Sequence, residues 1–491
     1  MTSSTHYHYI DSQPENPFSK LVNNQKILII PSFELESGEV LYDVPVAYKT
    51  WGRLNAQRNN VMIICHAFTG SADVADWWGP LLGKDKAFDP TKFFVICLNS
   101  LGSPYGSCSP VTINPQTGHH YGPEFPLCTI RDDVKIHKLV LDHLNVTQVA
   151  CVIGGSMGGM LVLEYPSIFG PNYIRSIVAL ATSARHSAWC ISWGEAQRQS
   201  IYSDPKYNDG YYQLADGPVT GLSAARMSAL LTYRSRNSFE SRFANKISNG
   251  TSNEANDNKI SHSSSNSNSS LKNFQDENWV IHNDGHKTAI GSLQRSSSNA
   301  SVTSLSSNRS QNNSSSNLKK RPQTFFTAQS YLRYQGNKFI QRFDPNCYIQ
   351  ISRKLDTHDL TRDRYYPFPQ YYTYIPLQIS VEDQLSTLSQ PSLVVGISSD
   401  NLFTLSEQQL LADYLPNSEF YEIESAEGHD AFLLEFQIID DIILKFLNKN
   451  LKDIMRATVV DENDLIVDES ILGKNGNNNS VFGEAEDIIN W

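Results

Sequence analysis

Five short runs of almost continuous apolar residues occur along the chain, at residues 60–68, 92–100, 148–156, 176–183 and 391–399. They are rich in Val, Ile and Leu, which is typical of strands in a parallel sheet that is covered on both faces. Apolar residues at helical spacing predict helices over residues 129–144, 405–415 and 429–451. Residues 26–52 instead predict antiparallel edge strands with a turn at Glu36–Gly38. The alternation predicts an α/β fold with a mostly parallel sheet and helices on both faces.

The strand pattern stops after Ala184 and resumes at Pro391. We therefore predict a discontinuous core, residues 1–186 and 376–491, and an inserted helical lid, residues 187–375. Nearly half of residues 261–320 are serine or asparagine. Such a segment has too few apolar groups to form a packed core, so we predict that about 244–321 is a disordered insertion in the lid. For residues 278–293 a short docking motif is the alternative.

Composition and charge narrow the class of protein. The chain has 491 residues and a net charge of -11, which argues against nucleic acid or an anionic membrane as partner. No apolar run reaches the roughly 18 residues of a membrane span, and the first twenty residues lack the apolar core of a secretory signal. The seven scattered cysteines fit reduced thiols, so we expect a cytoplasmic protein.

A serine between glycines marks the end of the third apolar run. The sequence Gly154-Gly155-Ser156-Met157-Gly158 follows this run and precedes a helical pattern. This is the strand–turn–helix setting of a nucleophile elbow, in which a strained turn exposes the serine hydroxyl. The alternative is a glycine-rich turn with a structural serine.

An acid and a base follow in the chain order that such a serine requires, serine first, then aspartate or glutamate, then histidine. Asp400 comes directly after the run 391–399, and His429 follows the strand-like run 419–425. Both lie at carboxyl ends of predicted strands, where the sites of α/β folds gather. We predict that Ser156 is the nucleophile, His429 its base and Asp400 the acid that orients the histidine.

Two backbone N–H groups are predicted to form an oxyanion hole for the tetrahedral intermediate. One belongs to Met157, which follows the nucleophile, and the other to Phe68 in the loop after an early strand. His66 in that loop precedes the serine, which is the wrong order for the base. We interpret His66 as a residue that structures the loop.

Several longer motifs together resemble the homoserine O-acetyltransferases, especially the fungal ones, over nearly all of the chain outside the insertion and the tails. They include HAFTGSADVADWWGP at 66–80, GGSMGGM at 154–160, GLSAARMSALLTYRSR at 221–236 and GHDAFLLE at 428–435. The resemblance implies an α/β-hydrolase fold with a helical lid, and a homodimer. It also implies the triad Ser156, Asp400 and His429.

The resemblance further implies three substrate-binding residues. Arg226 would hold the homoserine carboxylate, Tyr233 would make a further substrate contact, and Asp430 would face the amino group. A guanidinium offers a planar fork that suits a carboxylate. From the residues alone, Arg226 could equally pair with a carboxylate of the lid. Phe68 stands where the family commonly has leucine, but only its backbone N–H is needed.

The function implied by the resemblance is transfer of an acetyl group from acetyl-CoA to L-homoserine by a ping-pong mechanism, in methionine biosynthesis. Acetyl-CoA is then a co-substrate, and we expect no cofactor and no metal. The triad itself leaves open a serine O-acetyltransferase, a homoserine O-succinyltransferase or an esterase. A non-enzymatic ligand-binding protein is the remaining alternative, which the presence of every triad member disfavours.

Overall fold

The computed structural model describes residues 6–246, 278–279, 281–286, 326–366 and 377–459. Within these residues nine strands form one sheet in the order β1-β2-β3-β5-β4-β6-β7-β8-β9. The first three strands and β5 pair antiparallel, and the pairs from β5 to β9 are parallel. The strands are β1 (His8–Ile10), β2 (Lys26–Glu34), β3 (Val40–Trp51), β4 (Val61–Cys65), β5 (Phe94–Leu98), β6 (Val149–Gly155), β7 (Ile177–Leu180), β8 (Ser392–Ile397) and β9 (Ser418–Ile423).

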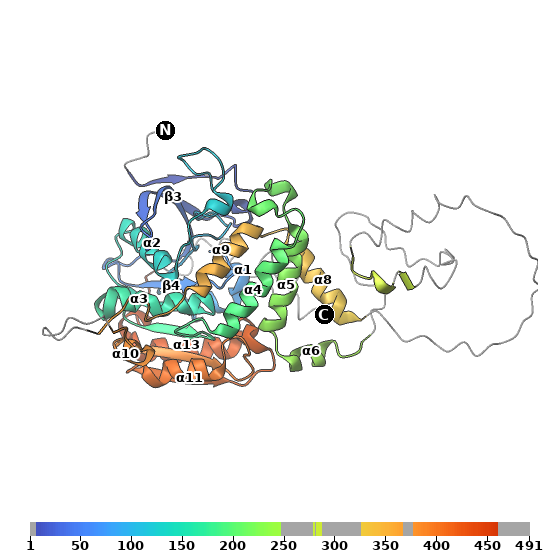
Figure 1. Ribbon diagram of the computed structural model, residues 1–491. Coiled ribbons are helices and arrows are strands. Elements are labelled where there is room, and N and C mark those ends of the chain that lie inside the picture. Colours follow the sequence, from blue (N-terminus) through green and yellow to red (C-terminus); the bar gives the residue numbers. More distant parts are fainter. Residues whose placement is uncertain (1–5, 247–277, 280, 287–325, 367–376, 460–491) are drawn as a thin grey trace, which may run out of the picture. The chain divides into compact units, whose positions relative to one another are not determined.

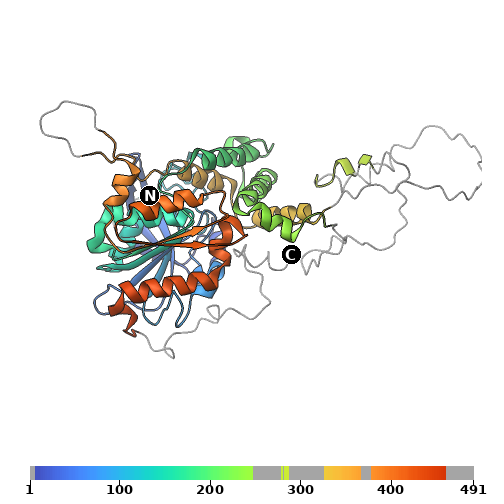
Figure 2. The ribbon, with the colours of Figure 1, turned by 90° about the horizontal axis from the view of Figure 1, so that it is seen from below.

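The parallel strands are buried on both faces because their alternate side chains enter two different cores. In β4, Ile63 contributes to one apolar cluster, and Met62 and Ile64 to the other. The first cluster includes α2 (Ile130–His143), α3 (Met157–Tyr173) and α11 (Leu405–Tyr414), and the second includes α13 (Phe436–Asn450). Figure 2 shows α13 on one side of the sheet and the helices of the first cluster on the other. The continuous apolar runs thus reflect burial on two faces.

Further helices lie in the chain between β7 and β8 (Figure 1). Helix α4 packs against both α5 and α9. The helices described in this interval include α4 (Ala188–Tyr202), α5 (Val219–Tyr233), α6 (Arg236–Arg242), α8 (Thr327–Phe339), α9 (Pro345–Asp356) and α10 (Val381–Ser386). No helix within the described ranges is both long and apolar enough to cross a membrane.

The chain divides into two compact units, residues 1–240 with 335–491, and residues 241–334. The sheet lies entirely in the first unit. In the described part of the second unit, the rings of Phe243 and Tyr331 pack with centroids 4.9 Å apart, and Arg333 forms an ion pair with Asp284 at 2.7 Å. The predicted insertion at 244–321 lies largely outside the described residues, and the predicted boundaries of core and lid stay a prediction.

The predicted fold class is confirmed, with all five apolar runs present as parallel strands and the turn at Glu36–Gly38 joining β2 to β3. Two details differ from the sequence prediction. Residues 8–10, for which the sequence analysis predicts no strand, form β1 and pair with β2. The helical pattern over 429–451 is divided, because Glu435 has non-helical backbone angles between α12 (Ala431–Leu434) and α13.

Candidate active site

Ser156 lies at the sharp turn between β6 and α3. Its φ of 58° is a left-handed conformation that a residue with a side chain rarely adopts. Two hydrogen bonds hold the turn: Ser156 N donates to Leu180 O at 3.1 Å, and Thr182 Oγ1 donates to Ser156 O at 2.8 Å. A Cβ at Gly158 would overlap the carbonyl oxygen of Cys65, so strand and helix approach as closely as only glycine permits. The geometry is that of a nucleophile elbow.

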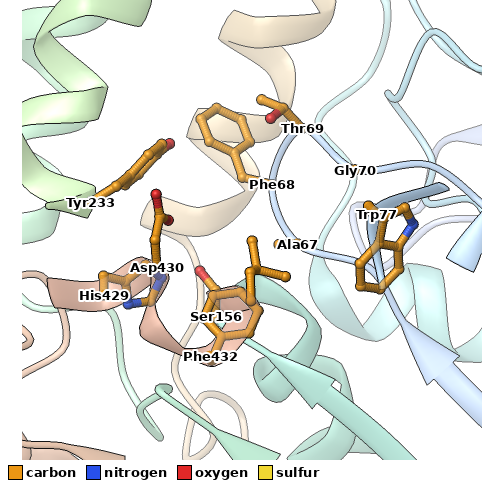
Figure 3. Close-up of a pocket in the computed structure, with 11 residues that line it drawn as sticks. Ala67, Phe68, Thr69, Gly70, Trp77, Ser156, Tyr233, His429, Asp430 and Phe432 are labelled. Carbon is orange, nitrogen blue, oxygen red and sulfur yellow. The ribbon is translucent and has the colours of Figure 1, made fainter. Parts of the chain in front are cut away.

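His429 and Asp400 form a buried hydrogen-bonded pair. Asp400 follows β8, and His429 lies in the short 3₁₀ turn η7 (Gly428–Asp430) after β9. His429 Nδ1 is 2.7 Å from Asp400 Oδ2. A carboxylate only accepts, so Nδ1 carries the proton and Nε2 is left to accept one. In Figure 3 the Ser156 hydroxyl points toward the side chains of His429 and Asp430.

The pKa of His429 reflects opposing effects. Burial lowers it, but the charge of Asp400, the hydrogen bond with Asp400 and the charge of Asp430 together raise this pKa above its ordinary value. The two carboxylates therefore stabilise the imidazolium that forms when the histidine takes a proton. This suits a general base that accepts a proton and later returns it.

Gln408 in α11 is a contact of the acid that the sequence analysis missed. Its side chain is fully buried, and Nε2 donates to Asp400 Oδ2 at 3.1 Å and to Phe403 O at 2.6 Å, while Oε1 accepts from Ile397 N at 2.7 Å. Asp400 Oδ1 also accepts from two backbone N–H groups, those of Leu402 at 2.8 Å and Phe403 at 3.0 Å. The orientation of the carboxylate is thus fixed from several directions. The spacing of apolar residues predicts the helix but does not indicate that one of its polar residues contacts Asp400.

A pocket opens above the elbow, with about 630 Å³ of space when the open solvent at its mouth is included. It brings Ser156 and His429 together with three other predicted site residues, Phe68, Tyr233 and Asp430 (Figure 3). The rest of the lining is Ala67, Thr69, Gly70, Trp77, Phe432 and Leu433. Met157 is fully buried at the start of α3 and Asp400 lies behind His429, so neither lines the pocket. Seven of the eight predicted residues thus lie in or directly behind one site, and the eighth, Arg226, does not line the pocket.

The sequence is similar to those of known proteins. It matches the family described as alpha/beta hydrolase fold over residues 60–436. The homoserine O-acetyltransferase of Saccharomyces pastorianus is 55% identical to it, covering 98% of this chain and 97% of that protein. The homoserine O-acetyltransferase of Saccharomyces cerevisiae is 54% identical, covering 97% and 96%. The chain belongs to the homoserine O-acetyltransferase family.

A solved structure carries the same fold at lower identity. The homoserine O-acetyltransferase of Bacillus anthracis superimposes with a TM-score of 0.64 at 20% identity, covering 89% of this chain and 98% of that one. The fold of this homoserine O-acetyltransferase family member is therefore shared with a distant bacterial protein. The sequence-based assignment to the family is confirmed.

Arg226 lies behind the pocket wall of this family member. It is buried in α5, with its guanidinium 5.5 Å from the ring centroid of Tyr233 and 4.8 Å from that of Phe339. Tyr233 lines the pocket and its ring also approaches that of His429, with centroids 6.2 Å apart. The structure thus places Arg226 one aromatic ring away from the pocket, in contact with a lining residue.

Arg234 is a second residue that the sequence analysis missed. It is almost fully buried at the end of α5, and it forms ion pairs with Asp430 at 3.1 Å and with Glu427 at 2.7 Å. A Cβ at Gly428 would lie 2.5 Å from Ser235 N, so the backbone after α5 rests directly on the histidine loop. Asp430 is therefore held by an arginine as well as exposed to the pocket. Arg234, like Tyr233, lies in the family motif at 221–236, but nothing local in the sequence indicated a partner nearly 200 residues away.

Proposed function

We propose that the protein transfers an acetyl group from acetyl-CoA to the hydroxyl of L-homoserine, which gives O-acetyl-L-homoserine and CoA, in methionine biosynthesis. The observation that carries the proposal is the identity of 55% with a homoserine O-acetyltransferase over nearly the whole length of both chains. The pocket that joins a strained serine to a histidine–aspartate pair supports it, because acyl transfer needs an activated nucleophile.

The first half-reaction makes an acyl-enzyme. His429 Nε2 takes the Ser156 proton as the oxygen attacks the thioester carbonyl, and the carbonyl oxygen becomes an oxyanion. The backbone N–H groups of Phe68 and Met157 would donate to this oxyanion. When the tetrahedral intermediate collapses, the C–S bond breaks, and the thiolate of CoA takes the proton from His429. An acetyl ester on Ser156 remains.

The second half-reaction repeats these steps with homoserine as the nucleophile. His429 removes the proton of the homoserine hydroxyl, whose oxygen attacks the acetyl-Ser156 carbonyl. Collapse of the intermediate releases O-acetylhomoserine, and Ser156 regains its proton from His429. Arg226 with Tyr233 would hold the carboxylate of the substrate, and Asp430 its ammonium group. For Arg226, this requires the Tyr233 ring to admit the carboxylate to the guanidinium.

The direct test is a matrix of donors and acceptors with the purified protein. Acetyl-CoA and succinyl-CoA are each combined with L-homoserine, L-serine or water alone, and CoA release and products are followed by mass spectrometry. We expect efficient turnover only with acetyl-CoA and homoserine, and an acetyl group on the Ser156 peptide when homoserine is omitted. Faster transfer to serine would instead identify a serine O-acetyltransferase, and faster transfer from succinyl-CoA a homoserine O-succinyltransferase. Faster transfer to water would identify an esterase.

We also propose a cytoplasmic homodimer. The seven cysteines are buried free thiols, which fits a reducing compartment. Helices α4 and α5 expose Trp189, Ile191 and Leu231, with 56% of Trp189 and 51% of Leu231 accessible, and apolar groups gathered on a surface favour association. Light scattering during gel filtration tests the dimer, and Leu231→Glu should shift it toward monomer. A monomer at micromolar concentration would contradict the proposal.

A further inference from the structure

His66, the first residue after β4, forms two hydrogen bonds that define its protonation. Its Nδ1 lies 2.8 Å from the backbone oxygen of Ala67, and the backbone N–H of Ser100 donates to its Nε2 at 3.0 Å. A carbonyl oxygen only accepts and a backbone N–H only donates. The proton of the ring must therefore be on Nδ1, which donates to Ala67.

The surroundings of His66 keep this tautomer neutral. Burial lowers the pKa of His66 to about 4; the hydrogen bond to Ala67 opposes the shift, and the charge of Lys354 adds to it. Protonation at Nε2 would direct an N–H toward the N–H of Ser100 in a site that is only 2% exposed to water. The ring thus presents one donor and one acceptor throughout the neutral pH range.

The Ala67 carbonyl belongs to the same peptide group as the N–H of Phe68, which lines the pocket beside Ser156. The peptide bond is a resonance hybrid, so a donor at its oxygen draws electron density from its nitrogen and makes the N–H a stronger donor. The Gly70 N–H also donates to Ala67 O, at 3.0 Å. In the same loop Arg342 Nη1 donates to Thr69 O at 3.0 Å, and this hydrogen bond restrains the loop two residues after Ala67.

We propose that His66 is a positioning residue that aims and strengthens the Phe68 oxyanion donor through the Ala67 carbonyl. The proposal rests on the proposed function, in which Phe68 stabilises the oxyanion of acyl transfer. His66 itself contacts neither substrate nor the reacting atoms. It connects the end of β5, through Ser100, to the peptide that faces the developing charge.

Two substitutions separate the two hydrogen bonds of the ring. In His66→Asn the side-chain NH₂ lies near the position of Nδ1 and can still donate to Ala67 O, while the bond from Ser100 is lost. In His66→Gln the side-chain oxygen can reach the position of Nε2 and accept from Ser100, while Ala67 O loses its side-chain donor. Each variant loses one hydrogen bond of a buried histidine, so we expect similar decreases in melting temperature.

The rate of acylation by acetyl-CoA should distinguish the variants. Loss of a whole oxyanion donor typically costs about a hundred- to a thousandfold, so a weakened donor should cost less. We expect about a tenfold decrease in His66→Gln and less than about threefold in His66→Asn, with little change in the KM for acetyl-CoA. His358→Gln is the control, because His358 is also buried and bonds a backbone carbonyl, that of Ser183 at 3.2 Å.

Infrared spectra of the acyl-enzyme give a second readout that loss of stability does not change. With a ¹³C-labelled acetyl group on Ser156, the carbonyl band should move to higher wavenumber in His66→Gln but not in His66→Asn or His358→Gln. Equal rate losses in the two His66 variants, without a band shift, would overturn the proposal. If His66→Gln does not fold, an acylation loss of tenfold or more in folded His66→Asn, at unchanged KM, would also overturn it.

Failure of the proposed function would look different. If the unmodified protein transfers acetyl groups without forming acetyl-Ser156, the covalent mechanism is wrong. An oxyanion still forms in direct transfer, so the ratio of turnover between His66→Asn and His66→Gln still tests the role of His66. If the unmodified protein transfers no acyl group at all, acyl transfer is wrong and the positioning role falls with it.

Discussion

Among single residues, Ser156 combines a strained backbone turn with a place in the pocket lining beside His429. Ser156→Ala removes the proposed nucleophile, for which the pocket lining offers no second serine or cysteine. We expect turnover to fall by about a millionfold, as is typical of a triad nucleophile, with an unchanged melting temperature. Steady-state kinetics and thermal melting check this, and near-normal turnover would show that Ser156 is not the nucleophile.

Asp430 should influence the pH dependence of acylation. Its negative charge contributes to the raised pKa of His429. His429 must be neutral to act as a base, so activity is lost as the pH falls through this pKa. Asp430→Asn removes the charge and leaves the Arg234 cation without one of its two partners. Both changes lower the pKa of His429, so the acid limb of kcat/KM for acetyl-CoA should move to lower pH; a shift to higher pH would contradict this assignment.

Arg226 should matter mainly for the second half-reaction. Arg226→Lys keeps the charge but loses the planar group that packs on Tyr233 and Phe339 and could hold a carboxylate with two hydrogen bonds. A lost hydrogen bond to a charged group costs about 1.5–3 kcal/mol, or roughly ten- to a hundredfold in rate. Pre-steady-state measurement of both half-reactions should find acylation preserved and transfer slowed. Slowed acylation with normal transfer would place Arg226 on the CoA side.

The residues that sequence reasoning missed share a physical cause. Gln408 contacts Asp400 eight positions away on a helix that starts after a loop, and Arg234 contacts residues almost 200 positions away. Neither residue type nor spacing predicts such contacts, because they depend on how the loops fold back. Ser156, by contrast, is marked by the glycines that its own turn requires.

Among the elements, the close backbone contact between the end of α5 and η7 depends on one glycine. Gly428 has a φ of 75°, and a Cβ there would lie 2.5 Å from Ser235 N and 2.7 Å from Arg234 C. Backbone strain alone should therefore make Gly428→Ala lower the free energy of unfolding by about 1–3 kcal/mol. Activity should also fall, because His429 shifts with the loop. Denaturant unfolding and kinetics check this, with Gly38→Ala as a control at a positive φ with open space around it.

The elements themselves were predicted unevenly. Strands β4 to β8 were found because burial on both faces makes them continuously apolar. The sequence does not predict the break between α12 and α13, because Phe432 and Ile439 keep helical spacing across it. Only Glu435 leaves the helical conformation. Apolar periodicity reports which side of the chain is buried, but not whether the backbone stays helical between buried positions.

At the scale of the whole molecule, a fully buried ion pair connects distant parts of the chain. Lys354 in α9 lies 2.5 Å from Asp133 in α2 and also donates to Leu101 O at 2.7 Å, beyond β5. Burial raises the pKa of Asp133, and the charge of Lys354 opposes this. Residues 221 positions apart cannot be paired from a single sequence, so this contact could not be predicted.

Breaking this pair should destabilise the protein strongly. Lys354→Met leaves Asp133 buried without its cation, which typically costs about 3–5 kcal/mol. Urea unfolding should give that decrease, whereas Lys449→Met, which removes the exposed pair of Lys449 with Glu419, should cost less than about 1 kcal/mol. Equal effects of the two substitutions would mean that burial of the Lys354 pair adds nothing to stability.

The contact at Gly428 also bears on how members of the family could be recombined. The stretch after α5 that carries Arg234 and Ser235 rests on the backbone of the loop that carries His429, and Ser235 Oγ donates to Ala426 O. A segment between β7 and β8 transplanted from a relative would bring its own backbone path to this contact and its own partner for Glu427 and Asp430, and a different path would displace the histidine. Protein engineers who exchange lids to change acceptor preference should therefore move the histidine loop with the lid, as one cassette.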